Sequence, residues 1–381
     1  METFPNEREL AAWAIRRLRE ILPPSWEVVE EQREIATVGD RPDAILALRT
    51  QHNYASVIVE AKASLSPKGA DTVLAQLGPY LTKFGRAEVL VVAPSLSPRT
   101  QERLRTNGWN YLDQDGNVFL NIESPTVFVQ VAAPKGAAAR AARSESALRL
   151  SSATAARVVR TLVDCTPPLT NGEIAQAATT TAGYVSKVLD GLDNERLVTK
   201  GKRGSVVDVD WEGLLRRWAA AASQTRSEGE RFFIARAGAE ALTQSLRVEV
   251  ALVEADRWAI SASFAARELA PITAPTMLSV FVDDLDAFAA RCGLISTDGP
   301  IGADVRLVPA YDRIVWARRI AVSGLWLAPL AEIVADSLQG AGRAPAEGEA
   351  LLRWMRDKAI WRREDSTSTG GTSLDETSLR P

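Results

Sequence analysis

One apolar run that ends in charged residues constrains the fold of this chain more than any other feature. Residues 56–61 are almost continuously apolar through Val57-Ile58-Val59, and they lead into Glu60-Ala61-Lys62. A strand that is apolar along its whole length is usually buried on both faces, as in sheets covered by helices. The run therefore predicts a buried strand of an α/β domain, with charges at its end.

Helix and strand patterns alternate through residues 1–132. Helices are predicted over residues 6–22, 71–84 and 98–107. Strands are predicted over residues 26–35, 43–48, 56–61 and 89–93. Within residues 109–121, Asp115-Gly116 indicates a hairpin turn. The order αβββαβ favours a mixed sheet with helices on its faces.

Three residues at the strand ends point to phosphate chemistry. Asp43 opens one predicted strand, and Glu60 and Lys62 lie on one face at the end of the next. Two carboxylates are suitable ligands for Mg²⁺, which could polarise a phosphate and lower the pKa of a bound water. Lys62 could stabilise the charge that develops on the phosphate. We therefore predict Asp43, Glu60 and Lys62 as catalytic residues, with the two carboxylates as metal ligands.

Pro42-Asp43 and Glu60-Ala61-Lys62 resemble the motif of the PD-(D/E)XK nuclease superfamily, which has the restriction-endonuclease-like fold. Gln76 and Tyr80 form Q-x-x-x-Y on the following predicted helix, which resembles the extra motif of the RecB-like branch. The resemblance covers about 130 residues and implies Mg²⁺-dependent DNA cleavage, with Glu7 or Glu9 as a further acid. The alternative is a nuclease-derived fold with salt-bridged carboxylates that serves as a binding module.

The middle of the chain has local signals for three helices and a hairpin. Residues 152–165 have a helical apolar face that ends before Pro167-Pro168, and Thr170 and Glu173 have the spacing of a capping box. The next predicted helix carries Val185, Val188, Leu189 and Leu192 on its inner face. Residues 197–209 then favour a β-hairpin with a basic tip.

This segment resembles a winged helix-turn-helix over about 60 residues. The resemblance implies duplex DNA binding, with the third helix in the major groove and the hairpin tip on phosphates. The DNA-contact residues that we predict are Tyr184, Ser186, Lys187, Lys200, Lys202 and Arg203. The alternative is a winged helix that contacts protein.

The C-terminal segment resembles a degenerate nucleotidyltransferase-like α/β unit. Ala262-Ser263 stands where active members carry Gly-Gly or Gly-Ser, and the predicted strand at residues 278–282 carries no paired acids. We expect Asp283-Asp284 to cap the next helix, and Asp336 and Arg343 to form a structural ion pair. The order of winged helix and degenerate segment resembles AbiE-type (type IV) antitoxin-related regulators. These usually begin with the winged helix, whereas this chain begins with the nuclease-like segment.

Composition sets further bounds. The net charge is −3 over 381 residues, so any nucleic-acid surface is a local patch. His52 is the single histidine, which removes most histidine-based catalysis, and Cys165 and Cys292 favour a reducing cytoplasm over a disulfide scaffold. No apolar run reaches the length of a membrane span. We expect a cytoplasmic protein.

The segments combine into an expected domain order. It is a nuclease-like domain (1–132), a linker (133–150), a winged helix (151–222), a nucleotidyltransferase-like domain (230–360) and a disordered tail (364–381). Two functions compete for this arrangement. The first is a bacterial DNA-binding transcriptional regulator resembling type IV antitoxins. The alternative is a Mg²⁺-dependent DNA endonuclease that acts in defence against foreign DNA.

A third interpretation is an antitoxin that opposes a nucleotidyltransferase-type toxin, with DNA binding secondary. Winged helices often bind paired half-sites, so a homodimer is also an expectation.

Overall fold

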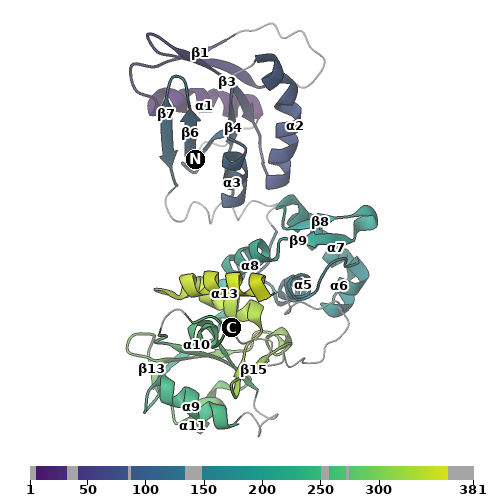
Figure 1. Ribbon diagram of the computed structural model, residues 1–381, viewed down its shortest axis with the longest axis vertical. Coiled ribbons are helices and arrows are strands. Elements are labelled where there is room, and N and C mark those ends of the chain that lie inside the picture. Colours follow the sequence, from purple (N-terminus) through teal and green to yellow (C-terminus); the bar gives the residue numbers. More distant parts are fainter. Residues whose placement is uncertain are drawn as a thin grey trace. The chain divides into compact units, whose positions relative to one another are not determined.

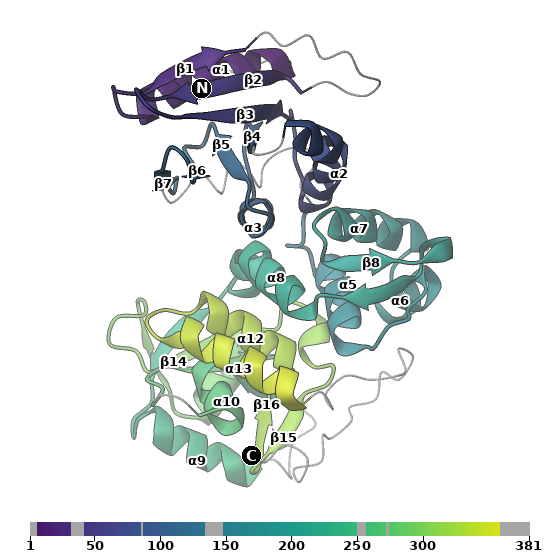
Figure 2. The same cartoon turned by 45° about the horizontal axis from the view of Figure 1, so that its top comes forward.

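The computed structural model describes residues 6–31, 42–84, 87–133, 148–249, 257–271 and 274–358. The chain divides into two compact units (Figures 1 and 2). The first is Met1–Ala147 with Asp193–Arg196, and the second is Leu148–Leu192 with Leu197–Pro381. Most of the expected linker and all of the expected tail lie outside the described residues. None of the helices in these ranges combines the length and apolar character that a membrane crossing needs.

The first unit is built on a seven-stranded mixed sheet. Its strands are β1 (Glu27–Glu30), β2 (Ala44–Arg49), β3 (Tyr54–Ala61), β4 (Glu88–Ala93), β5 (Asn110–Asp113), β6 (Val118–Ile122) and β7 (Val127–Val131). They lie in the sheet in chain order. The pairs β3–β4 and β4–β5 are parallel and the others antiparallel. The carboxyl ends of β3, β4 and β5 therefore share one edge.

Helices cover both faces of this sheet, as Figure 2 shows. They are α1 (Glu7–Ile21), α2 (Pro67–Phe84) and α3 (Pro98–Thr106). Side chains alternate along each strand, so Val59 packs in the core with α1 whereas Ile58 packs in the core with α2 and α3. The predicted buried strand at residues 56–61 is confirmed as the covered strand β3.

The structure adds detail to the predicted elements. Helix α2 begins at Pro67 because Ser66 caps it, accepting a hydrogen bond from the Gly69 amide, and Pro67 takes the first turn. Strand β7 was not predicted. Most of the predicted strand at residues 26–35 lies in β1, while residues 32–41 are outside the described ranges.

The second unit begins with helices and a small hairpin. The helices are α5 (Ala153–Asp164), α6 (Asn171–Ala177), most of α7 (Ala182–Asn194) and α8 (Trp211–Arg226). The hairpin is β8 (Val198–Lys200), a short 3₁₀ turn η1 (Lys202–Gly204) and β9 (Val206–Val209). The predicted capping box is confirmed. The Glu173 amide donates to Thr170 Oγ1 at 3.2 Å, and the Thr170 amide donates to Glu173 Oε2 at 2.7 Å.

A second mixed sheet follows in the same unit. Its strands are β10 (Arg231–Ile234), β11 (Trp258–Ser261), β12 (Leu278–Val282), β13 (Ile295–Thr297), β14 (Val305–Pro309), β15 (Ile320–Val322) and β16 (Leu325–Leu327). Their order is β13-β10-β14-β12-β11-β16-β15. The helices are α9 (Ala239–Glu249), α10 (Ala262–Leu269), α11 (Leu285–Arg291), α12 (Leu330–Gln339) and α13 (Ala344–Lys358), with a 3₁₀ turn η2 (Arg313–Val315). Figure 1 shows α10 and α13 on one side and α9 and α11 on the other.

Two expectations about acidic residues in this sheet have different outcomes. Asp284 caps α11 as predicted, accepting a hydrogen bond from the Ala287 amide at 2.9 Å. The expected Asp336–Arg343 ion pair is wrong. Asp336 faces α8, where its carboxylate lies 2.9 Å from the Arg226 guanidinium, and it also accepts a hydrogen bond from Ser261.

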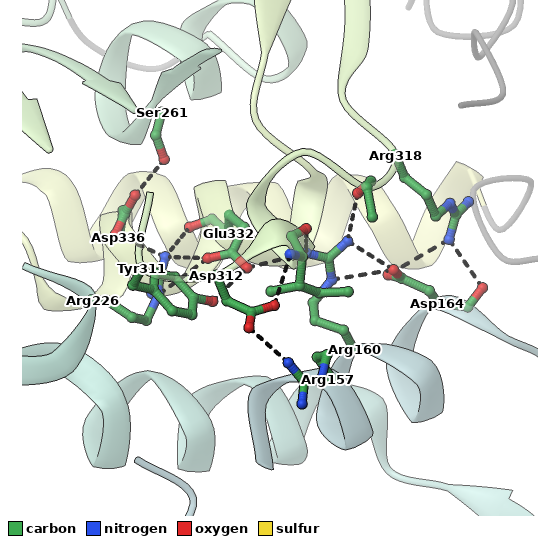
Figure 3. A network of polar contacts seen from close by, with 12 residues as sticks. Arg157, Arg160, Asp164, Arg226, Ser261, Tyr311, Asp312, Arg318, Glu332 and Asp336 are labelled. Carbon is green, nitrogen blue, oxygen red and sulfur yellow. Dashed lines mark hydrogen bonds and ion pairs between the residues drawn. The ribbon is translucent and has the colours of Figure 1, made fainter. Parts of the chain in front are cut away.

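A buried ionic network holds the helical and sheet parts of this unit together (Figure 3). Arg160 of α5 lies 3.1 Å from Glu332 of α12 and 2.9 Å from Asp164, and Glu332 is also 2.8 Å from Arg226 of α8. Both arginines and Glu332 are almost completely excluded from solvent. Pairing compensates the cost of burying these charges. Around the network, one continuous apolar core runs from α5 to α13.

Candidate active site

The sheet register brings the two predicted carboxylates together. Ala44 of β2 lies opposite Val59 of β3, and continuing this antiparallel register places Asp43 opposite Glu60. Asp43 Oδ2 accepts a hydrogen bond from the Ala61 amide at 2.8 Å. The hydrogen bond fixes one Asp43 oxygen against the end of β3, while the residue itself is exposed.

Glu60 and Lys62 form an ion pair at the end of β3. Lys62 Nζ lies 2.6 Å from Glu60 Oε1. Both follow the alternation of Ile58, so they lie on the sheet face that α2 and α3 cover. Glu60 is only 7% exposed, whereas Lys62 is half-buried. The predicted grouping of Asp43, Glu60 and Lys62 is therefore present in the geometry.

The first helix contributes a further acid at this edge. Glu7 Oε1 accepts a hydrogen bond from the Ala63 amide at 3.3 Å, which brings it to the end of β3. Glu9 instead lies with the helix cap, where its amide donates to Asn6 Oδ1 at 2.9 Å. Of the two acids that the sequence left open, Glu7 is the one beside the site.

The electrostatics of the site follow from burial and from crowding of negative charge. Burial is the largest influence on Glu60 and raises its pKa; Asp43 and Glu7 raise it further, and Lys62 only partly opposes this. Burial alone would lower the pKa of Lys62, but Glu60, Glu7 and Asp43 together raise it above its ordinary value. Lys62 therefore stays protonated at neutral pH, and Glu60 holds its proton to a higher pH than a solvated carboxyl does.

The donor set suits a hard divalent cation. Asp43, Glu60 and Glu7 offer carboxylate oxygens, the ligands that Mg²⁺ prefers. Within the described ranges, however, no group of three or more His, Cys, Asp or Glu residues is arranged to hold a metal ion. Lys62 already engages one oxygen of Glu60, and the Ala61 amide engages one oxygen of Asp43. A cation at this edge would compete with the Lys62 ammonium for Glu60.

Of the predicted Q-x-x-x-Y pair, the structure describes the side chain of Gln76 and does not bring it to the site. Helix α2 buries Ala70, Val73 and Leu77 toward the sheet. Gln76 lies on the flank of this face, exposed, and among the described residues it makes no hydrogen bond to the carboxylates at the β3 end. The side chain of Tyr80 lies outside what the structure describes.

One carboxylate at the same sheet edge was not singled out from the sequence. Asp113 ends β5 and is 2% exposed, and burial raises its pKa. It accepts hydrogen bonds from the Asn117 amide at 2.8 Å, from Asn117 Nδ2 at 2.7 Å and from the Leu96 amide at 3.1 Å. Its oxygens are thus committed to the turns around it, so Asp113 shapes the edge without offering a ligand.

A cavity of about 460 Å³ lies elsewhere, at the opposite end of β2 and β3. Its lining comprises Glu31, Arg49, Thr50, Gln51, His52, Asn53 and Tyr54. Because these residues flank the β2–β3 turn, the cavity is separated from Glu60 by the length of β3.

The predicted DNA-contact residues of the helical segment differ in how accessible they are. Lys187 is exposed on α7 and Lys202 is exposed at the hairpin tip. Tyr184 was expected on the outer face, but its ring is half-buried against the core and its hydroxyl lies 3.4 Å from Ser152 Oγ. Ser186 is also half-buried.

Lys200 forms an ion pair with Asp190 of α7, so its charge is partly neutralised within the chain. The side chain of Arg203 lies outside what the structure describes.

Comparisons with known proteins give one distant likeness. No protein-family model matches the chain, and no curated protein matches it. A solved structure titled "Structure of EndoMS in apo form" is similar at 20% sequence identity with a TM-score of 0.20. The likeness covers 30% of this chain and 47% of that chain, so less than half of that protein's length is matched. By its own geometry, this chain is a mixed α/β protein with two mixed sheets.

Proposed function

We propose that the first unit is a divalent-cation-dependent DNA endonuclease of the PD-(D/E)XK type. One observation carries the proposal. Asp43 at the start of β2 and the Glu60–Lys62 pair at the end of β3 converge on one sheet face, beside Glu7. Two carboxylates and one protonated amine are the groups that phosphodiester hydrolysis without histidine requires.

Each residue has a distinct role in this proposal. A bound Mg²⁺ would supply polarisation of the scissile phosphate and a water of lowered pKa. Asp43, oriented by the Ala61 amide, and Glu60 in its ionised form would hold the cation. Lys62 keeps its proton because three carboxylates surround it, so it stabilises negative charge on the phosphate as the transition state forms.

The test is a cleavage assay with the full chain on duplex, branched and single-stranded DNA, with Mg²⁺ or Mn²⁺. Asp43→Asn and Glu60→Gln should each abolish cleavage, because each neutralises one ligand while nearly keeping its shape. Glu9→Gln is the matched control, because Glu9 is an exposed acid on the same helix as Glu7. Absence of cleavage on every substrate, or cleavage that survives both substitutions, contradicts the proposal.

A second proposal concerns duplex docking by the segment α5–α8, for which two exposed lysines give the reason. Lys187 on α7 and Lys202 at the tip of the β8–β9 hairpin are exposed, and we assign duplex contact to these two elements. Docking without cleavage would correspond to a DNA-binding regulator resembling type IV antitoxins. If the chain both docks on duplex DNA and cleaves it, the docking segment would instead direct the nuclease to its DNA substrate. The same assay, run beside a duplex-binding measurement, separates these two functions.

A further inference from the structure

An arginine lies between two tryptophans at one end of the second sheet. Arg319 precedes β15, Trp316 follows η2 and Trp326 lies in β16. The Arg319 guanidinium carbon is 4.9 Å from the Trp326 ring centroid and 5.4 Å from that of Trp316. Arg257 approaches the Trp316 ring as well, at 5.5 Å. Cation–π attraction thus fixes two guanidinium groups around a pair of indoles.

The two arginines differ in how their charge is compensated. Arg257 has a carboxylate partner, since its Nε lies 2.7 Å from Asp283 Oδ2. Arg319 donates to the neutral carbonyl of Trp258 at 3.2 Å, and among the described residues it forms no ion pair. A guanidinium has five N–H donors, so within the described ranges most of the donor capacity of Arg319 is left for another acceptor.

The surroundings of Arg319 favour an incoming anion. Arg319 is half-buried, and removing a charge from water is costly unless the charge is paired. Burial lowers the pKa of Arg319, and the positive charge of Arg257 lowers it further, while the Asp283 carboxylate opposes these two effects. An anion that accepts hydrogen bonds from Arg319 would offset the cost of burying its charge and the repulsion from Arg257.

We propose that Arg319 and Arg257, framed by Trp316 and Trp326, form a binding site for the phosphate group of a nucleotide or nucleic-acid strand. The planar guanidinium fork matches a phosphate in a bidentate arrangement. The two indoles hold the guanidinium groups in place by cation–π contact, so the group that is recognised is the phosphate itself. The site lies in the second unit, so it does not depend on cleavage by the first.

The matched control for this site is Arg231. Its guanidinium lies 5.4 Å from the Phe233 ring centroid, also in the second unit, but it pairs with Asp286 at 2.6 Å. Arg231→Gln therefore removes an arginine of similar geometry whose charge is already compensated. Arg319→Lys keeps the charge at the site and loses the bidentate fork.

The test is isothermal titration of the full chain in metal-free buffer with inorganic phosphate, thymidine monophosphate, a short oligothymidylate and acetate. Arg319→Gln should weaken phosphate-ligand binding by at least about tenfold, the scale of a lost charge-assisted bidentate contact. Arg319→Lys should weaken it by a smaller factor, and Arg231→Gln should leave it unchanged. Equal melting temperatures show that the variants are folded.

The ligands separate the sources of the phosphate. If Arg319→Gln loses affinity for thymidine monophosphate as well as for oligothymidylate, the site binds nucleotides. If it loses affinity for oligothymidylate alone, the site binds a nucleic-acid strand. Wild-type affinity of Arg319→Gln for all phosphate ligands overturns the proposal, as does acetate binding as tight as phosphate binding.

Discussion

Lys62 Nζ lies 2.6 Å from Glu60 Oε1, so the ammonium is paired with a carboxylate that the proposed cation needs as a ligand. This relationship gives Lys62 two opposing effects. It competes with a cation for Glu60, and it is the positive charge available to the phosphate in the transition state. Binding and catalysis should therefore respond to Lys62 in opposite directions.

The first prediction follows from this opposition. Lys62→Gln should lower the single-turnover cleavage rate by about 10²–10³, the usual cost of removing one group that stabilises transition-state charge. The affinity of the same variant for Ca²⁺ should rise or stay equal, because Glu60 loses its competing partner. Calorimetric titration with Ca²⁺ beside the cleavage assay measures both quantities. Parallel loss of cation affinity and rate would show that Lys62 only supports the fold.

The second prediction concerns pH. Burial, Asp43 and Glu7 raise the pKa of Glu60, and a protonated Glu60 cannot hold a cation. Cation binding and cleavage should therefore decline as pH falls through this raised pKa, at a higher pH than for a solvated carboxyl. Glu7→Gln removes one negative neighbour, which lowers the pKa of Glu60 and moves the acidic limb to lower pH. A pH–rate profile checks the direction.

Glu9→Gln serves as the control for this shift, since Glu9 lies on the same helix and does not influence Glu60. An acidic limb that keeps its position in Glu7→Gln would mean that a group other than Glu60 sets it.

The third prediction tests the ionic network of the second unit. Arg160→Met leaves Glu332 and Asp164 without one of their partners in a fully buried setting. Breaking a buried pair in this way typically costs about 3–5 kcal/mol. Arg231→Gln, which removes a solvent-exposed pair with Asp286, should cost below about 1 kcal/mol. Scanning calorimetry should show the difference in the transition of the second unit, and similar shifts for both variants would refute it.

Local patterns predicted much of the first sheet and its site. The apolar run of β3 and the alternation along it place Glu60 and Lys62 on one face without any tertiary information. Glu7 and Glu9 lie on nearly opposite sides of α1, and Glu7 shares the helix face of the buried Leu10 and Ala14, so helical periodicity could have favoured Glu7. The docking of α1 on the sheet then brings Glu7 to the Ala63 amide.

Contacts between segments far apart in the sequence explain the remaining differences between the sequence-based predictions and the structure. Arg160 and Glu332 are 172 positions apart, so nothing in the neighbourhood of either residue indicates the other. The same holds for Asp336, whose partner Arg226 lies on a helix packed against α12 rather than seven positions along the chain. Lys200 was expected to be available for DNA, but it pairs with Asp190. The sequence does not indicate this pair, because it forms only when the hairpin folds back on α7.

The last prediction uses that pairing. Asp190→Asn releases the Lys200 ammonium, so duplex DNA affinity should rise and the salt dependence should steepen by up to about one unit, the effect of one added phosphate contact. Lys187→Gln and Lys202→Gln should weaken binding and flatten the salt dependence, because both side chains are exposed. Lys200→Gln should have a smaller effect than Lys202→Gln, since Asp190 already neutralises part of the charge of Lys200.

Fluorescence anisotropy with a labelled duplex at several salt concentrations measures the salt dependence of binding for each variant. If Asp190→Asn binds no more tightly than the wild-type chain, or if Lys202→Gln retains full affinity, the hairpin does not contact the duplex and docking through α7 and its hairpin is excluded.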